Sequence, residues 1–190
     1  MYLAHYVLLP YFPLSTIPNL STYTTFPIYR YIWAGKLVRG AYMHSERLRA
    51  MEGGYESPIF EKIEETHANY NAAIDMVLQH IAEGQRADVM IATHNQASIE
   101  HAIYRMRDLG VSTSAGVSFG QLLGMADNIT FPLGANGFKA YKCVPYGRVS
   151  ETLPYLIRRA QENSGVLAGA GHERRLLAKE IHRRLCVALM

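Results

Sequence analysis

From Lys36 onward the sequence alternates between short apolar runs and longer stretches of helical periodicity, and this alternation restricts the fold more than any other feature. The apolar runs occupy residues 36–42, 89–94, 117–122 and 139–144. Apolar residues recur at three- to four-residue spacing over about 61–83 and 95–110, and a shorter helical segment precedes the fourth run. Strands that alternate with helices form parallel sheets through right-handed crossovers. The sequence therefore predicts an α/β fold with parallel strands, either a small open sheet or part of a barrel.

Length and composition narrow the choice further. The chain has 190 residues, which suits one domain but falls short of the roughly 250 residues of a complete (β/α)₈ barrel. No Gly-x-Gly-x-x-Gly segment follows a predicted strand, which argues against a Rossmann fold. The only cysteines are Cys143 and Cys186, so no disulfide framework is expected. The histidines show no metal-ligand spacing, and no metal site is predicted.

The two ends of the chain differ from its middle. Residues 1–35 carry four prolines, no acidic residue and no clear period. They are interpreted as a poorly structured leader, separate from a domain at residues 36–190. The net charge of +3 comes from residues 171–190, which are predicted to form a basic helix. Aromatic residues do not interleave with these charges, so nucleic-acid binding is not expected. No apolar run reaches the 18 residues of a membrane-spanning helix.

Small and polar residues gather at the ends of the predicted strands, where parallel α/β folds bind their ligands. They are Arg39, Gly40, Ala41, Tyr42, Thr93, His94, Asn95, Gln121, Leu122 and Cys143. Each has a purely structural alternative; Thr93-His94-Asn95, for example, is also an ordinary helix-capping turn. Their joint occurrence at one rim predicts a site for a large, planar, anionic ligand.

The last strand is followed by a helix that contains two adjacent arginines. Tyr155, Arg158, Arg159 and Glu162 fall on one helical face, whereas Leu153, Leu156, Ile157 and Ala160 are expected to pack inward. Two guanidinium groups beside a phenol can bind a small carboxylate through charge-assisted hydrogen bonds. The alternative is an exposed basic face with no ligand.

Four segments in this order resemble the FAD-dependent proline dehydrogenases, in particular the eukaryotic mitochondrial branch with its hydroxyproline dehydrogenases. They are KLVRGAY at 36–42, ATHN at 92–95, QLLGM at 121–125 and YLIRRAQEN at 155–163. The resemblance covers about residues 35–186. It implies the C-terminal half of a distorted (β/α)₈ barrel with FAD at the carboxyl ends of its strands, followed by a terminal amphipathic helix.

The resemblance also implies a role for each matching residue. The expected cofactor-binding residues are Lys36, Val38, Arg39, Gly40, Ala41, Thr93, His94 and Glu162. The expected substrate-binding residues are Arg158, Arg159, Tyr155, Tyr42, Leu122 and Cys143. The implied reaction oxidises L-proline or trans-4-hydroxy-L-proline to the corresponding 1-pyrroline-5-carboxylate, and the electrons pass to quinone. Mitochondrial location and peripheral association with the matrix side of the inner membrane are implied as well.

This sequence departs from the family pattern in two important places. Cys143 stands where proline-specific members carry Tyr, and a small residue there resembles the hydroxyproline branch because it leaves room for a ring hydroxyl. The first half of the barrel has no counterpart in residues 1–35. Two expectations therefore stand side by side: a dehydrogenase whose remaining strands lie in a longer protein, or a non-catalytic half-barrel that does not hold FAD and folds poorly alone.

Overall fold

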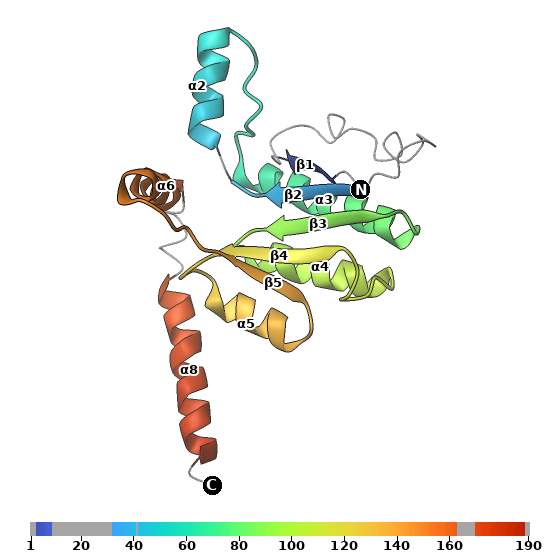
Figure 1. Ribbon diagram of the computed structural model, residues 1–190, viewed down its shortest axis with the longest axis vertical. Helices are drawn as coiled ribbons and strands as arrows, with labels where there is room; N and C mark the ends of the chain where they lie inside the picture. Colours follow the sequence, from blue (N-terminus) through green and yellow to red (C-terminus); the bar gives the residue numbers. More distant parts are fainter. Residues whose placement is uncertain (1–2, 9–31, 41, 163–169, 189–190) are drawn as a thin grey trace.

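The computed structural model describes residues 3–8, 32–40, 42–162 and 170–188. Its centre is a parallel sheet of five strands in the order β1-β2-β3-β4-β5 (Figure 1). The strands are β1 at Leu3–Leu8, β2 at Ile32–Val38, β3 at Ala87–Ala92, β4 at Val117–Leu122 and β5 at Lys139–Cys143. The predicted α/β class with parallel strands is confirmed.

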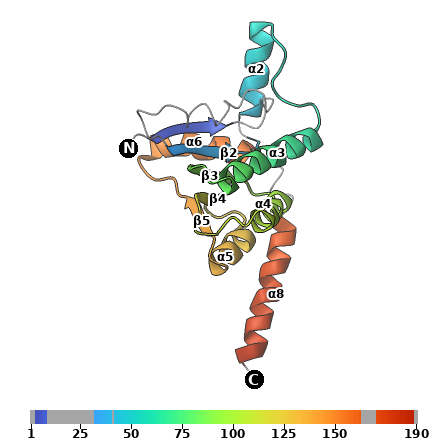
Figure 2. The ribbon, with the colours of Figure 1, turned by 90° about the vertical axis from the view of Figure 1, so that its right-hand side faces the viewer.

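Helices α3 at Ile63–Ala82, α4 at Gln96–Asp108 and α5 at Asp127–Ala135 cover one face of this sheet (Figures 1 and 2). Helices α2 at Met43–Gly53 and α6 at Val149–Glu162 lie beyond the carboxyl ends of the strands. Helix α8 at Ala170–Ala188 extends away from the sheet. None of the helices in the described part of the chain is long and apolar enough to cross a membrane.

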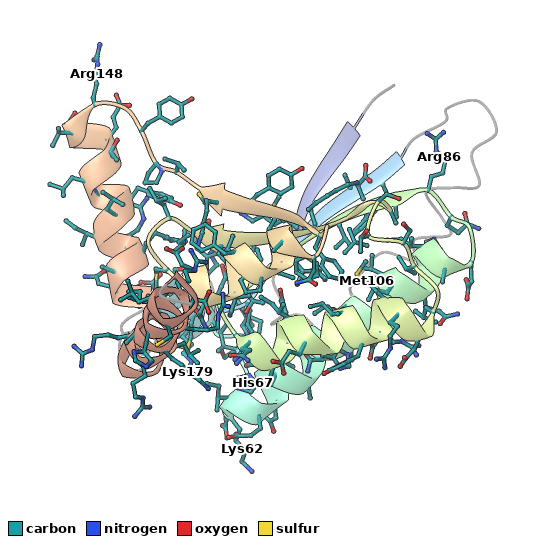
Figure 3. The ribbon with its side chains drawn as sticks, turned by 90° about the horizontal axis from the view of Figure 1, so that it is seen from below. Lys62, His67, Arg86, Met106, Arg148 and Lys179 are labelled. Carbon is teal, nitrogen blue, oxygen red and sulfur yellow. The ribbon has the colours of Figure 1, made fainter. Side chains whose placement is uncertain are left out.

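The core lies between the sheet and the three covering helices. Leu37, Ile91 and Phe119 of the strands share one buried cluster with Tyr70 of α3 and Met106 of α4, and each of these side chains is at most 2% exposed. Met106 lies between α4 and the sheet (Figure 3). The hydroxyl of Tyr70 donates to the carbonyl oxygen of Leu37 at 3.1 Å. This bond satisfies a buried phenol, which would otherwise destabilise the core. The packing of Leu37 against α3 fixes the end of β2 and thus the position of the residues that follow Val38.

Several boundaries differ from the sequence-based prediction. Strand β1 and the start of β2 fall within residues 1–35, where no regular element is predicted, so that prediction is wrong for these two segments. Residues 43–53 form α2, a helix that the sequence does not predict. Short apolar or polar stretches carry too little periodicity to reveal such elements.

The apolar face of α6 is not buried, contrary to the prediction, and the apolar side chains of α8 are exposed as well. Leu153, Leu156 and Ile157 of α6 are between 42% and 51% exposed. On α8, Leu176, Leu177, Ile181 and Leu185 are between 38% and 60% exposed. Periodicity identifies an apolar face but does not identify the surface that covers it. In the described part of the chain both apolar faces remain partly open to solvent, although α5 contacts α8.

Candidate active site at the carboxyl ends of the strands

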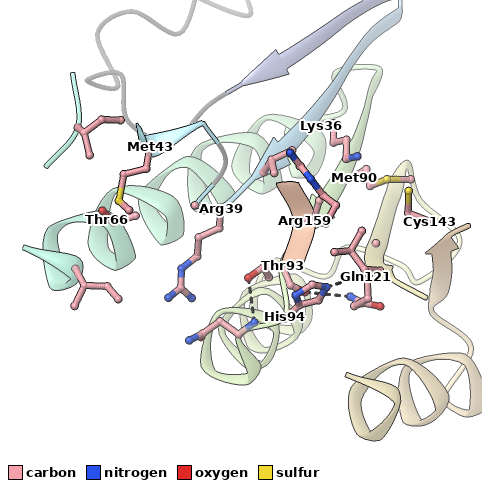
Figure 4. Close-up of a pocket in the computed structure, with 18 of the residues that line it drawn as sticks. Lys36, Arg39, Met43, Thr66, Met90, Thr93, His94, Gln121, Cys143 and Arg159 are labelled. Atoms are coloured by element: carbon pink, nitrogen blue, oxygen red, sulfur yellow. Dashed lines mark hydrogen bonds between the residues drawn. The ribbon is translucent and has the colours of Figure 1, made fainter. Parts of the chain in front are cut away.

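A cavity of about 700 Å³ opens at the carboxyl ends of β2 to β5 and beneath α6 (Figure 4). The predicted site residues that line it are Lys36, Val38, Arg39, Gly40, Thr93, His94, Leu122, Cys143, Tyr155 and Arg159. Tyr42 and Arg158 are exposed and do not line the cavity. Ala41 and the side chain of Glu162 lie outside the described residues. The structure thus brings together most of the residues that sequence reasoning places in one site.

Arg39 lines the cavity directly after β2, where the chain turns at Gly40 (φ 81°). One terminal guanidinium nitrogen, Nη2, lies 3.1 Å from Nε2 of His67 on α3. The other, Nη1, donates to Oγ of Ser98 on α4 at 3.4 Å. The cation is therefore held between two of the covering helices.

The segment Thr93-His94-Asn95 both caps a helix and forms part of the cavity. Asn95 accepts the backbone N–H of Ser98 at 2.9 Å, which confirms it as the N-cap of α4. His94 points the other way: its Nε2 accepts the backbone N–H of Leu122 at 3.0 Å (Figure 4). Because Nε2 is an acceptor in this bond, the neutral ring carries its hydrogen on Nδ1. The predicted capping role is thus confirmed, and the same segment also lines the cavity.

Two polar side chains secure the floor of the cavity: Gln121, which the sequence predicts at the rim, and Lys142, which it does not single out. Buried Gln121 donates from Nε2 to the carbonyl oxygen of Thr93 at 3.4 Å and accepts the hydroxyl of Thr130 at 3.0 Å. Lys142 donates to the carbonyl oxygen of Met125 at 2.6 Å and pairs with Asp127 at 2.7 Å. These bonds fix the loop after β4, and with it Leu122. Successive side chains of a strand point to opposite faces. This alternation is the signal in the sequence that Gln121 and Lys142 lie on the face opposite to Leu122 and Cys143.

Helix α6 presents Tyr155 and Arg159 to the cavity. The guanidinium carbon of Arg159 lies 5.3 Å from the centre of the Tyr155 ring, a cation–π distance. The hydroxyl of Tyr155 lies 3.5 Å from the sulfur of Cys143 at the end of β5. A guanidinium, a phenol and a small thiol therefore form one continuous wall.

The charge of the cavity favours an anionic ligand. Its lining includes the cationic side chains of Lys36, Arg39, Arg47, Lys62, Lys142 and Arg159, against the single carboxylate of Glu61. Apolar Val38, Met90 and Ala92 line the same space. A Cβ at Gly120 would lie 3.1 Å from Sδ of Met90, so this part of the wall is closely packed. Cations beside a flat apolar surface fit the diphosphate and the ring system of a dinucleotide such as FAD. Within the described residues, no group of side chains could hold a metal ion.

Comparison of the sequence with known proteins points to one family. A family model described as "Proline dehydrogenase" matches residues 29–170. "Proline dehydrogenase 1, mitochondrial" of Homo sapiens is 50% identical over 154 residues, which are 80% of this chain and 26% of that protein. "Hydroxyproline dehydrogenase" of Xenopus laevis is 49% identical over 152 residues, 79% of this chain and 33% of the relative. The chain thus spans between a quarter and a third of the length of these relatives.

Solved structures support the same barrel architecture. Proline utilization A from Bdellovibrio bacteriovorus, inactivated by N-propargylglycine, superposes with a TM-score of 0.71 at 24% identity over 84% of this chain and 16% of that chain. A structure of proline utilization A with proline bound in remote sites superposes with a TM-score of 0.60 at 28% identity. The match covers 70% of this chain and 13% of that chain. The predicted fold, the C-terminal half of a distorted (β/α)₈ barrel, is confirmed.

Proposed function

Because this chain belongs to the proline dehydrogenase family, we propose that it forms the FAD- and substrate-binding part of an oxidoreductase. The proposed reaction converts L-proline or trans-4-hydroxy-L-proline into the corresponding 1-pyrroline-5-carboxylate. One observation carries the proposal: the wall formed by Cys143, Tyr155 and Arg159 faces the same cavity as Lys36, Arg39 and His94. The group proposed to bind the carboxylate and the groups proposed to bind the cofactor thus line one space.

The proposed cofactor site lies along the ends of β2 and β3. Lys36, Val38, Arg39, Gly40, Thr93 and His94 would hold FAD, and Ala41 and Glu162 are assigned to the same site by the family pattern. When bound, FAD would supply the acceptor for two electrons. The contribution of the chain would be electrostatic, because cations beside the ring system of the cofactor stabilise the negative charge that the cofactor gains when the substrate is oxidised.

The proposed substrate site lies under α6. Arg159 would bind the carboxylate through charge-assisted hydrogen bonds, and its contact with Tyr155 would fix the orientation of the guanidinium. Leu122, Tyr155 and Cys143 would surround the pyrrolidine ring. Arg158 and Tyr42 belong to the same proposed site by the family pattern, although both side chains are exposed in the described structure.

The electron acceptor and the location are further parts of the proposal. We infer that electrons pass to quinone, that the protein acts in mitochondria, and that it associates peripherally with the matrix side of the inner membrane. The names of the relatives support the mitochondrial location. The exposed apolar and basic side chains of α8 are candidates for the membrane contact.

The test combines cofactor binding with turnover. The purified chain is titrated with FAD by quenching of flavin fluorescence, and dye-coupled oxidation of proline and trans-4-hydroxyproline is measured in the same samples. Binding of FAD together with turnover is the expected result. The variant Arg159→Met should keep FAD binding and lose turnover at moderate substrate concentration, whereas Arg107→Met, an exposed change on α4, should keep both. Absence of FAD binding and of turnover would favour the second candidate, a non-catalytic half-barrel, whose specific support is the exposed apolar face of α6.

A further inference from the structure

His67 is a partly buried histidine on α3, one turn before Tyr70, and it does not itself line the cavity (Figure 3). Its Nε2 lies 3.1 Å from Nη2 of Arg39. A guanidinium can only donate hydrogen bonds, so Nε2 of His67 must be the acceptor. The ring is therefore neutral and carries its hydrogen on Nδ1. That Nδ1 is buried and has no hydrogen-bond partner among the described residues, so the hydrogen bond that the described structure gives this ring is the one to Arg39.

The surroundings keep this ring uncharged at neutral pH. Burial lowers the pKa of His67, the nearby charge of Arg39 lowers it further, and Glu64 on the same helix opposes both effects. Arg39, directly after β2, and Glu64 of α3 are the charged groups that act on the ring. Ser98 of α4, which also accepts from Arg39, is uncharged. Tyr70 of α3 is buried, and burial raises the pKa of its phenol, so it too is uncharged.

We propose that neutral His67 is a positioning residue that holds the guanidinium of Arg39 in the orientation in which the cavity binds its anionic cofactor. The identity of that cofactor as FAD rests on the proposed function. Protonated His67 would have no lone pair for Arg39 and would place a second cation against the guanidinium. The guanidinium would then leave this orientation, and cofactor affinity would fall.

A double-mutant cycle with FAD as the probe tests the proposal, with flavin fluorescence as the readout. His67→Leu removes the acceptor and should weaken FAD binding about 3- to 10-fold, the usual effect of one hydrogen bond. His67→Gln retains an acceptor and should recover most of that loss. In the Arg39→Met background, His67→Leu should have no further effect, because the residue that His67 positions is already absent. Equal losses in both backgrounds would mean a merely structural role and would overturn the proposal.

The pH profile gives a second readout. Wild-type affinity for FAD should fall as the pH drops through the lowered pKa of His67, and the His67→Gln profile should lack this step. His101→Gln is the matched control, since His101 is a partly buried histidine of α4 that pairs with Asp75 at 2.9 Å and does not line the cavity. This control should keep the wild-type profile. A wild-type step that persists in His67→Gln would count against the proposal.

A measurement that needs no cofactor separates this proposal from the proposed function. The ring resonances of His67 are followed by NMR as a function of pH in the wild type and in Arg39→Met. Loss of the neighbouring cation should move the pKa of His67 toward the ordinary value of about 6.5. If the chain binds no FAD but this shift occurs, the proposed function fails while the pairing of His67 with Arg39 stands. A pKa that does not respond to Arg39→Met would overturn the pairing itself.

Discussion

The sulfur of Cys143 lies 3.5 Å from the phenol oxygen of Tyr155, and this contact joins the end of β5 to the first half of α6. The other side of the Tyr155 ring contacts the guanidinium of Arg159, 5.3 Å from the ring centre. The size of the side chain at position 143 therefore determines how much space remains beside Tyr155 and Arg159. In the proposed substrate site, that space is where a ring substituent would lie.

Enlarging position 143 should change the preference between the two substrates. We expect Cys143→Tyr to lower kcat/KM for trans-4-hydroxyproline relative to proline by about 10-fold or more, since filling a pocket changes discrimination by a few kcal/mol. Cys143→Ser is the matched control, because it keeps the size of the side chain and should leave the ratio within about 3-fold. Steady-state kinetics with both substrates measures the ratio. An unchanged ratio in Cys143→Tyr would show that the ring substituent binds elsewhere.

The two adjacent arginines should contribute unequally to substrate binding. Arg159 lines the cavity, whereas Arg158 is exposed. Arg159→Met should raise KM for proline by about 10- to 100-fold, the range expected for lost hydrogen bonds to a carboxylate. Arg158→Met, tested beside it, should have a clearly smaller effect, and FAD content should stay constant in both. Equal effects would mean that Arg158 turns into the cavity when substrate binds.

The sheet and the rim of the site could be predicted from the sequence because both depend on local patterns. Val117–Leu122 is an apolar run between turns, and Asn95 is a recognisable cap, and both predictions are confirmed. Parallel strands bring their carboxyl ends to one edge. Residues that follow different strands, such as Arg39 and His94, therefore meet although they are far apart in sequence.

The contacts made by these residues could not be predicted in the same way. The pairing of Arg39 with His67 and that of Lys142 with Asp127 depend on the distance between a helix and a strand end, which no local pattern encodes. The exposure of the apolar face of α6 could not be predicted either. Tyr155 and Arg159 face the cavity, as the sequence predicts, but Leu156, which is expected to pack inward, is 42% exposed. Amphipathicity alone does not distinguish a polar face that lines a ligand site from one that faces water.

Loss of the His94 ring should destabilise the fold even without a ligand. Nε2 of His94 accepts the backbone N–H of Leu122, and a phenylalanine would leave that partly buried N–H without its acceptor. We expect His94→Phe to lower the free energy of unfolding by about 1–3 kcal/mol, measured by urea denaturation. His94→Gln, whose side-chain oxygen can accept, should lose less. His44→Phe, at an exposed histidine of α2, serves as the control for ring replacement. A His94→Phe variant as stable as the wild type would show that water replaces the lost bond.

Tyr70 should make the stability of the domain sensitive to alkaline pH. Burial raises the pKa of its phenol, with Arg39 opposing the shift, so the folded chain keeps the phenol protonated where the unfolded chain ionises it. A pKa that is raised on folding gives stability that is fully present below the unfolded value and is lost as the pH rises beyond it, here above about pH 10. Tyr70→Phe should lack this loss. Between pH 10 and 11, the unfolding free energy of the variant should therefore fall by about 1 kcal/mol less than that of the wild type. Tyr104→Phe, at an exposed ring, should follow the wild-type curve. Parallel curves for Tyr70→Phe and the wild type would mean that the phenol becomes accessible before the domain unfolds.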